Sequence, residues 1–226
     1  MPLLRRKQSS APADPADWRP QQFGRTGKVG DAIVEPAWRG VRVLATVEDG
    51  RARFVDETGA DCTVEFASVA QALIAAARAD SMILDGHLTV EPTQEGAGIA
   101  DATPESPGGA RVIAQMLVGG RVAAPAVTPR RLDPDRPVAF VAVDLLAIDG
   151  ASLLDIPLLE RKRLLDGAVC EDVIIRKTPF IRPPIATFLN TWRSLGFEDL
   201  VWKGINSRYR PGERNDEWTI SPIPMH

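Results

Sequence analysis

The chain has 226 residues, of which 44% are hydrophobic and 25% charged, and its formal net charge is −3. This length suffices for one large domain with a buried core, and no apolar run approaches the roughly 20 residues that span a bilayer, so a transmembrane helix is excluded. The acidic balance argues against a nucleic-acid-binding surface over the whole chain, although a local stripe of arginines could still contact DNA.

The beginning of the chain differs in composition from the rest. It is rich in Ser, Ala, Pro, Asp and Gln with little apolar periodicity, which predicts a flexible tail over residues 1–24. No apolar run follows its first charges, so a secretory signal is not expected. Cys62 and Cys170 lack a metal-type spacing and suit two buried thiols in a reducing compartment. We therefore expect a cytoplasmic protein with one folded domain over residues 25–226.

The first half of this domain is dominated by strand patterns. Residues 41–47 and 51–55, joined by Asp49-Gly50, predict a hairpin. Ser68 and Gln71 have the spacing of a capping box ahead of an Ala-rich helix that ends at residue 79. The following segments predict, in order, a strand over 82–90, a long surface loop over 91–109, a short helix over 110–118 and a polar connector over 130–137.

The second half mixes strands and helices. Pro157 suits the start of a helix, and the apolar spacing over 185–195, with Trp192 in the core, predicts another helix closed by Gly196. Strands are expected over 138–146, 199–203 and 217–220. Because strands and helices do not alternate as βαβ units, the pattern indicates an α+β fold with antiparallel sheets.

One segment carries chemistry by resemblance. Residues 35–42 read Glu-Pro-Ala-Trp-Arg-Gly-Val-Arg. They resemble the Glu-x-Lys-x-Asp-Gly-x-Arg segment of ATP-dependent DNA ligases, where the lysine amine attacks the α-phosphate of ATP and carries AMP as a phosphoramidate. Ala37 stands at the lysine position and Arg39 at the aspartate position. Because a methyl group has no lone pair, Ala37 cannot be a nucleophile.

Further segments follow in the family's order. They are Leu-Asp-Gly-His over 84–87, Val-Asp-Leu-Leu over 143–146, Pro-Leu-Leu-Glu-Arg-Lys-Arg over 157–163, Glu-Asp-Leu-Val-Trp-Lys over 198–203, and Ser-Arg-Tyr-Arg-Pro-Gly over 207–212 with Trp218 after it. The chain thus resembles the adenylation domain of ATP-dependent DNA ligases from about residue 34 to 220. The resemblance implies the nucleotidyltransferase fold of DNA ligases and mRNA capping enzymes, with two antiparallel sheets and flanking helices around a cleft.

The resemblance also implies a site. Its nucleotide-binding residues would be Glu35, Trp38, Arg42, Glu198 and Lys203, with ATP and Mg²⁺ as ligands, Glu198 on the metal and Lys203 on a phosphate. From the residues alone, Glu198 and Lys203 could equally be solvated charges, and Arg42 a phosphate ligand or a solvent-facing residue.

Several other positions have two readings. Because Asp85 precedes a glycine, a turn-stabilising role is favoured for it over that of a ligand. For His87, a structural role is favoured over that of a base or metal ligand. Lys28 could replace the missing nucleophile or be a mobile surface lysine. A DNA-contacting set is expected at Arg208, Arg210 and Arg214, with ordinary surface charge as the alternative.

The departures from the family pattern occur together. His87 replaces a glutamate, Val143 replaces an aromatic that stacks on adenine in the family, and Thr219-Ile220 follow Trp218 where the family has lysine. We therefore expect a ligase-like protein impaired in self-adenylation that binds nucleotide, DNA or a partner, with nicked DNA or DNA repair proteins as partners.

Two alternatives stay open. One is an active minimal ligase that uses an unusual nucleophile or seals pre-adenylated nicks, and the other is a structural protein that binds neither ligand. No C-terminal OB-fold domain is expected, because the chain stops soon after the last motif.

Overall fold

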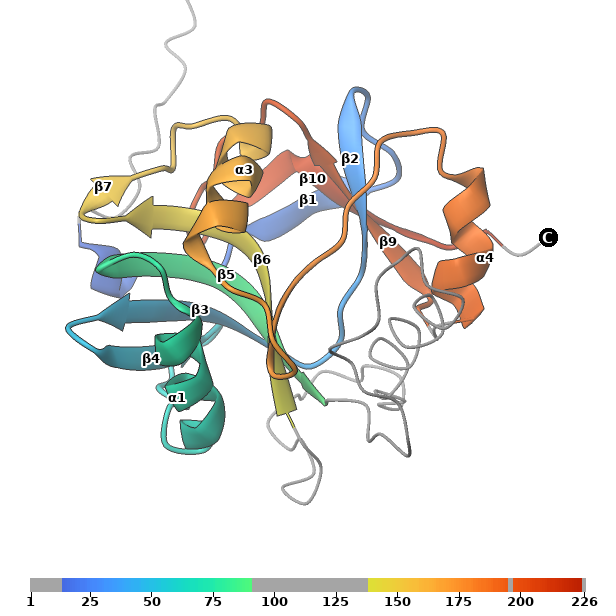
Figure 1. The fold of residues 1–226 in the computed structure, drawn as a ribbon. Helices are drawn as coiled ribbons and strands as arrows, with labels where there is room; N and C mark the ends of the chain where they lie inside the picture. Colours follow the sequence, from blue (N-terminus) through green and yellow to red (C-terminus); the bar gives the residue numbers. More distant parts are fainter. Residues whose placement is uncertain (1–13, 91–137, 195–196, 225–226) are drawn as a thin grey trace, which may run out of the picture.

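A computed structural model describes residues 14–90, 138–194 and 197–224, which form two packed sheets with helices on their outer faces (Figure 1). The loop predicted over 91–109, the helix over 110–118, the connector over 130–137 and Gly196 lie outside these residues. The smaller sheet has the order β1 (Gln22–Thr26), β10 (Arg214–Pro222), β9 (Asp199–Gly204) and β2 (Ala32–Pro36).

The larger sheet is mostly an antiparallel meander. Its order is β4 (Arg51–Asp56), β3 (Val41–Glu48), β5 (Ser81–Val90), β6 (Val138–Ile148) and β7 (Ala151–Ser152), and β8 (Ile175–Lys177) also pairs with β6. The pairing is antiparallel, as predicted, except that β1–β10 and β6–β8 are parallel.

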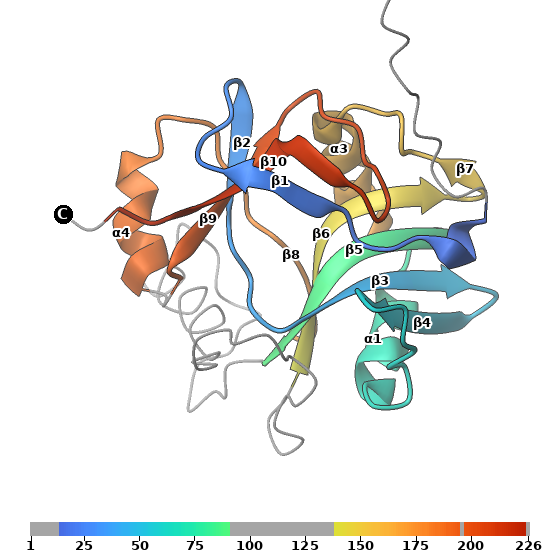
Figure 2. The ribbon, with the colours of Figure 1, turned by 180° about the vertical axis from the view of Figure 1, so that it is seen from behind.

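Helices cover the outer faces of both sheets. Helices α1 (Ala67–Ala76) and α3 (Leu158–Ala168) pack on the larger sheet, and α4 (Ala186–Ser194) packs on the smaller one (Figures 1 and 2). A central core that includes Ile33, Leu44 and Trp218 joins the two sheets. The predicted α+β class with two sheets and flanking helices is confirmed.

One local prediction is confirmed and another is wrong. The hairpin of β3 and β4 is confirmed, and Asp49 and Gly50 adopt the positive φ values, 50° and 68°, that its tight turn requires. The capping box at Ser68 is wrong, because the N-cap of α1 is Phe66, two residues before Ser68, and it has no side-chain cap. Phe66 is buried in the core, so packing sets the start of this helix.

The predicted boundary at residue 24 falls inside the folded domain. Trp18 is buried in the central core, the Gln21 side chain is also buried, and β1 pairs with β10. The sequence pattern does not predict this strand, because β1 lies at a sheet edge and is mostly exposed and polar. Among the described helices, none is long and apolar enough to cross a membrane. Both cysteines are free and half-buried.

Candidate functional site

The chain crosses from the smaller to the larger sheet within the ligase-like motif. Strand β2 ends at Pro36 and β3 begins at Val41, so residues 37–40 form the crossing. Gly40 has a φ of 122°, and a Cβ there would clash with the Leu88 carbonyl oxygen. The Ala37 amide donates to the Asp199 carbonyl oxygen at 3.0 Å. The crossing is thus held by a backbone hydrogen bond and a close approach at Gly40, and the Ala37 side chain within it is half-buried.

Glu35 is the centre of a buried cluster of charges that faces the larger sheet. Its carboxylate contacts the amine of Lys203 on β9 at 2.8 Å and, more closely, the amine of Lys162 on α3. The three side chains are at most 3% exposed, and the Lys203 amine lies 4.1 Å from the centroid of the Trp218 ring. We call Glu35, Lys162 and Lys203 the Glu35 cluster.

The protonation of the Glu35 cluster reflects its burial. Burial by itself raises the pKa of Glu35, but the two ammonium groups outweigh this and hold that pKa below its usual value. Burial lowers the pKa of Lys162, and the charge of Lys203 adds to this effect, whereas Glu35 opposes it. Glu35 is thus an anion shared by two amines, and Lys162 releases its proton more readily than a surface lysine.

Arg42 and Asp85 form a second buried pair beside this cluster. The guanidinium donates to both carboxylate oxygens at 3.1 and 2.7 Å, and the Tyr209 hydroxyl donates to Asp85 at 2.8 Å. Arg42 is 8% exposed, so the solvent-facing alternative for it is wrong. The turn-stabilising role of Asp85 is also wrong, because this residue is fully buried inside β5.

Arg161 and Asp144 form a third buried pair that the sequence did not reveal. Both are fully buried, with nitrogen–oxygen distances of 3.0 and 2.7 Å, and Arg161 also donates to the Ser207 carbonyl oxygen at 3.0 Å. This pair fixes α3 to β6 and so positions Lys162, the next residue on the helix. The Glu-Arg-Lys-Arg motif contains Arg161, but its sequence pattern predicts only the start of a helix.

Trp38, Arg39 and Glu198 lie at the rim of the site. The Trp38 indole donates to the Thr178 hydroxyl at 2.8 Å, and its ring meets Phe197 edge-on at 5.2 Å between centroids. The Arg39 guanidinium forms an ion pair with Glu198, whose side chain is 67% exposed. Glu198 thus faces solvent while Lys203 faces the interior, and the structure does not bring these two predicted site residues together.

The residues at the rim do not fit a divalent cation. Glu198, the predicted metal ligand, is engaged by a guanidinium, and Arg39 places a positive charge where a metal would need a negative one. Within the described ranges, no group of three or more His, Cys, Asp or Glu side chains is arranged to hold a metal ion.

His87 and Val143 occupy positions where the resemblance implied other chemistry. His87 lies opposite Arg42 in the β3–β5 register, and its Nδ1 is buried without a hydrogen-bond partner. Burial, together with the charge of Arg42, lowers its pKa to about 3, so its imidazole is neutral at physiological pH. The Val143 side chain is buried in β6, and it offers no ring for stacking.

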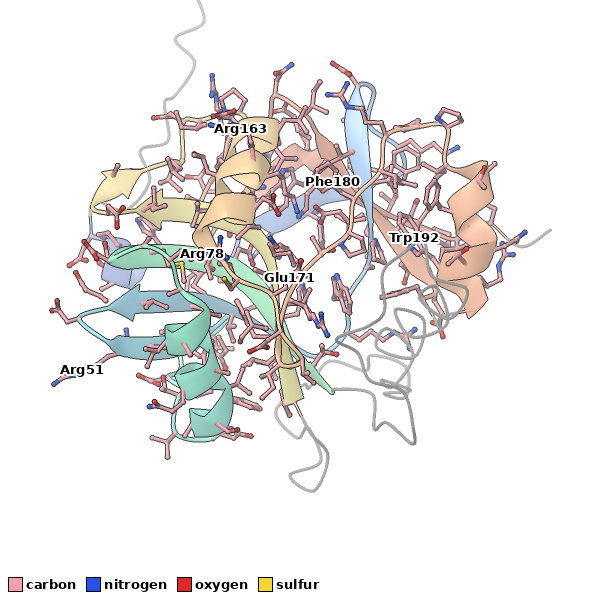
Figure 3. All side chains as sticks on the ribbon, in the orientation of Figure 1. Arg51, Arg78, Arg163, Glu171, Phe180 and Trp192 are labelled. Carbon is pink, nitrogen blue, oxygen red and sulfur yellow. The ribbon has the colours of Figure 1, made fainter. Side chains whose placement is uncertain are left out.

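An aromatic ring that the sequence did not single out lies beside the Glu35 cluster. Phe180 belongs to the segment between β8 and α4, where Ile181 pairs with Val34 of β2. Its side chain is 41% exposed, and its ring centroid is 5.5 Å from the Lys162 amine. Figure 3 shows Phe180 between α3 and β2. An accessible ring and a buried amine are therefore adjacent.

Lys28 is separated from the Glu35 cluster. Its amine lies 5.6 Å from the centroid of the Trp202 ring, which belongs to the core under α4. Because Trp202 and Lys203 are neighbours on a strand, their side chains point to opposite faces of the smaller sheet. Lys28 therefore lies on the face of the smaller sheet opposite the Glu35 cluster.

The three arginines proposed to contact DNA are exposed. Arg208 and Arg210 alternate with the buried Ser207 and Tyr209, so they share one exposed side of the segment between β9 and β10. Arg214 donates to the Gly24 carbonyl oxygen at 3.1 Å. Their contact with DNA stays a prediction.

Comparisons with known proteins agree with this architecture. The family described as "ATP dependent DNA ligase domain" matches residues 21–219. A probable DNA ligase of Streptomyces coelicolor is 32% identical over 208 residues, which cover 88% of this chain and 36% of that protein. A multifunctional non-homologous end joining DNA repair protein, LigD of Mycobacterium tuberculosis, is 27% identical over 189 residues, which cover 81% of this chain and 20% of the relative.

Solved structures resemble the fold. The crystal structure of the M. tuberculosis LigD ligase domain aligns with a TM-score of 0.64 and 24% identity, over 92% of this chain and 60% of that one. A mycobacterial DNA ligase D complexed with ATP and MES aligns with a TM-score of 0.60 and 22% identity, over 92% and 61% of the two chains. The chain spans about a third or less of the length of the sequence relatives named above.

Proposed function

The chain belongs to the ATP-dependent DNA ligase domain family, and from that premise we propose that it is a ligase-like domain impaired in self-adenylation, which acts as a binding module linked to DNA repair. The observation that carries the proposal is the methyl group of Ala37 in the crossing between β2 and β3. A self-adenylating enzyme needs an amine lone pair at that point, and no pKa shift can supply one to a methyl group.

The other lysines in the described ranges support this proposal. Lys162 and Lys203 are held on Glu35, and Lys177 is held by Asp166 at 2.6 Å. Lys28 lies on the opposite face of the smaller sheet. Each of these amines is thus either engaged by a carboxylate or, in the case of Lys28, on the face of the smaller sheet opposite the Glu35 cluster.

The binding role rests on what the site retains. The buried amines of Lys162 and Lys203 lie close to the exposed ring of Phe180. Amines can bind phosphate, and an aromatic ring can stack on a base. We propose a nucleotide as the ligand of this region, with nicked DNA or DNA repair proteins as partners. The family membership, the ATP complex of the mycobacterial relative and the end-joining role in the LigD name support these assignments.

An active minimal ligase is the second candidate, and Lys162 is the observation that favours it. Its lowered pKa increases the fraction of neutral amine. In such an enzyme the Lys162 amine would attack the α-phosphate of ATP, a P–N bond would form, pyrophosphate would leave, and the amine would release a proton. Sealing of pre-adenylated nicks without this first step is the other form of the same candidate.

Labelled ATP tests both candidates. The protein is incubated with ATP labelled at the α-phosphate and with Mg²⁺ or Mn²⁺, and an acid-labile adenylyl-protein is sought. We expect none. An adduct mapped to Lys162 and abolished by Lys162→Met would overturn the proposal in favour of an active ligase, and sealing of a pre-adenylated nick that Lys203→Ala abolishes would do the same.

A further inference from the structure

The ion pairs of the site leave positive charge in excess. They join four cations, Arg39, Arg42, Lys162 and Lys203, to three carboxylates, Glu35, Asp85 and Glu198. The excess is located in the Glu35 cluster, where one carboxylate serves two amines. Because an uncompensated charge is costly in a buried place, an anion from outside would be stabilised beside these amines.

Two substitutions in the ligase-like motifs add positive charge near the Glu35 cluster. Relative to the family pattern, arginine at 39 in place of aspartate adds two positive charges, and a neutral His87 in place of glutamate adds one. Ala37 and the Thr219-Ile220 segment, which stand where the family has lysine, remove positive charge. Arg39 also forms an ion pair with Glu198, the predicted metal ligand. The guanidinium therefore supplies positive charge where the metal would bind.

The Glu35 cluster lies close to the accessible rim. Phe180, which is 41% exposed, is beside the Lys162 amine. Thr178, two residues earlier, accepts a hydrogen bond from Trp38, so the Phe180 segment adjoins the Arg39 segment. A ligand held at this rim would meet the Phe180 ring and the Arg39 guanidinium, with the buried Lys162 amine 5.5 Å from the centroid of that ring.

We infer that this domain binds the phosphate groups of its ligand without a divalent cation, with Lys162 and Lys203 as the phosphate-binding amines and Arg39 in place of the metal. The inference rests on the proposed nucleotide-binding function and adds to it the chemistry of the ligand: a di- or triphosphate free of metal.

Calorimetric titration with inorganic pyrophosphate, and then with ATP, tests the inference at constant ionic strength. We expect saturable binding in EDTA, with a Kd that excess Mg²⁺ does not tighten by more than about threefold. Lys162→Met, which keeps the Glu35–Lys203 pair, should weaken binding about tenfold or more. Arg163→Met on the same helix is the matched control, because Arg163 is exposed and paired with Glu160 (Figure 3), and it should leave the Kd unchanged.

Arg39 provides the sharper comparison. Arg39→Asp should place a second carboxylate beside Glu198, so binding should now be lost in EDTA and restored by Mg²⁺, whereas Arg39→Lys should keep the metal-free behaviour. Wild-type binding that requires Mg²⁺, no binding in either buffer, or binding in EDTA that Lys162→Met leaves intact would each overturn the inference. Binding that requires Mg²⁺, or that survives Lys162→Met, overturns the inference and leaves nucleotide binding standing, whereas no binding in either buffer overturns both.

Discussion

Glu35→Gln is the substitution that tests the Glu35 cluster most severely. It removes the carboxylate that Lys162 and Lys203 contact and leaves two ammonium groups whose side chains are each 3% exposed. Removing one partner from a buried ion pair costs about 3–5 kcal/mol. Since Lys162 can release its proton in response, we expect the lower end, about 3 kcal/mol of unfolding free energy.

Urea unfolding at neutral pH measures this loss, with Glu160→Gln as the control. Glu160 lies on α3 in an exposed ion pair with Arg163, so its substitution should leave the urea midpoint unchanged. Adding Lys162→Met to Glu35→Gln should recover part of the loss, because a single amine then remains. Equal midpoints for wild type and Glu35→Gln would refute the buried cluster.

The pH dependence of the same variant gives an independent check. The pKa of Glu35 is lower in the folded chain than its ordinary value of 4.5, so the unfolded chain binds more protons as the pH falls below that value. The contribution of Glu35 to stability is therefore present above pH 4.5 and is lost as the pH falls towards the folded pKa. In Glu35→Gln this acid-dependent part should vanish.

Three more predictions follow from buried or strained positions. The pKa of His87 is about 3 in the folded chain and 6.5 ordinarily, so its contribution to stability should be present above pH 6.5 and decline by up to about 1.4 kcal/mol per pH unit as the pH falls towards 3. Urea unfolding should show a smaller loss of stability with falling pH for His87→Gln than for wild type. An identical loss would contradict the burial of this imidazole. Gly40→Ala should lower the melting temperature more than Gly27→Ala, because both have positive φ but only the first meets the Leu88 carbonyl oxygen; equal shifts would contradict the close approach. Arg161→Met should cost about 3–5 kcal/mol in urea unfolding, because it leaves Asp144 buried without its partner, and a loss below about 1 kcal/mol would argue against this pair.

The elements that the sequence predicted well are those with a strong local pattern. The Asp49-Gly50 turn fixed one hairpin, and apolar periodicity found α4 with Trp192 in the core. Strand β1 was missed because an exposed edge strand has no buried side to produce an alternating pattern.

The site could be predicted only in part. Motif order singled out Glu35, Arg42 and Lys203, which are buried charges in the structure, but it could not show that Glu35 contacts two amines or that Arg42 is paired with Asp85. These contacts join residues from β2, α3 and β9, or from β3 and β5, and depend on how the two sheets pack. Phe180 gave no signal, because a single aromatic residue in an irregular segment has no periodicity.

The central claim, that the motif is built while its nucleophile is absent, is tested most directly by comparing self-adenylation of the natural chain with that of a restored one. The restored variant carries Ala37→Lys, Arg39→Asp and His87→Glu, and intact-protein mass after incubation with ATP and Mg²⁺ is the measurement. We predict that the natural chain gains no AMP and that the restored chain gains one on the new lysine. An AMP adduct on the natural chain would contradict the claim.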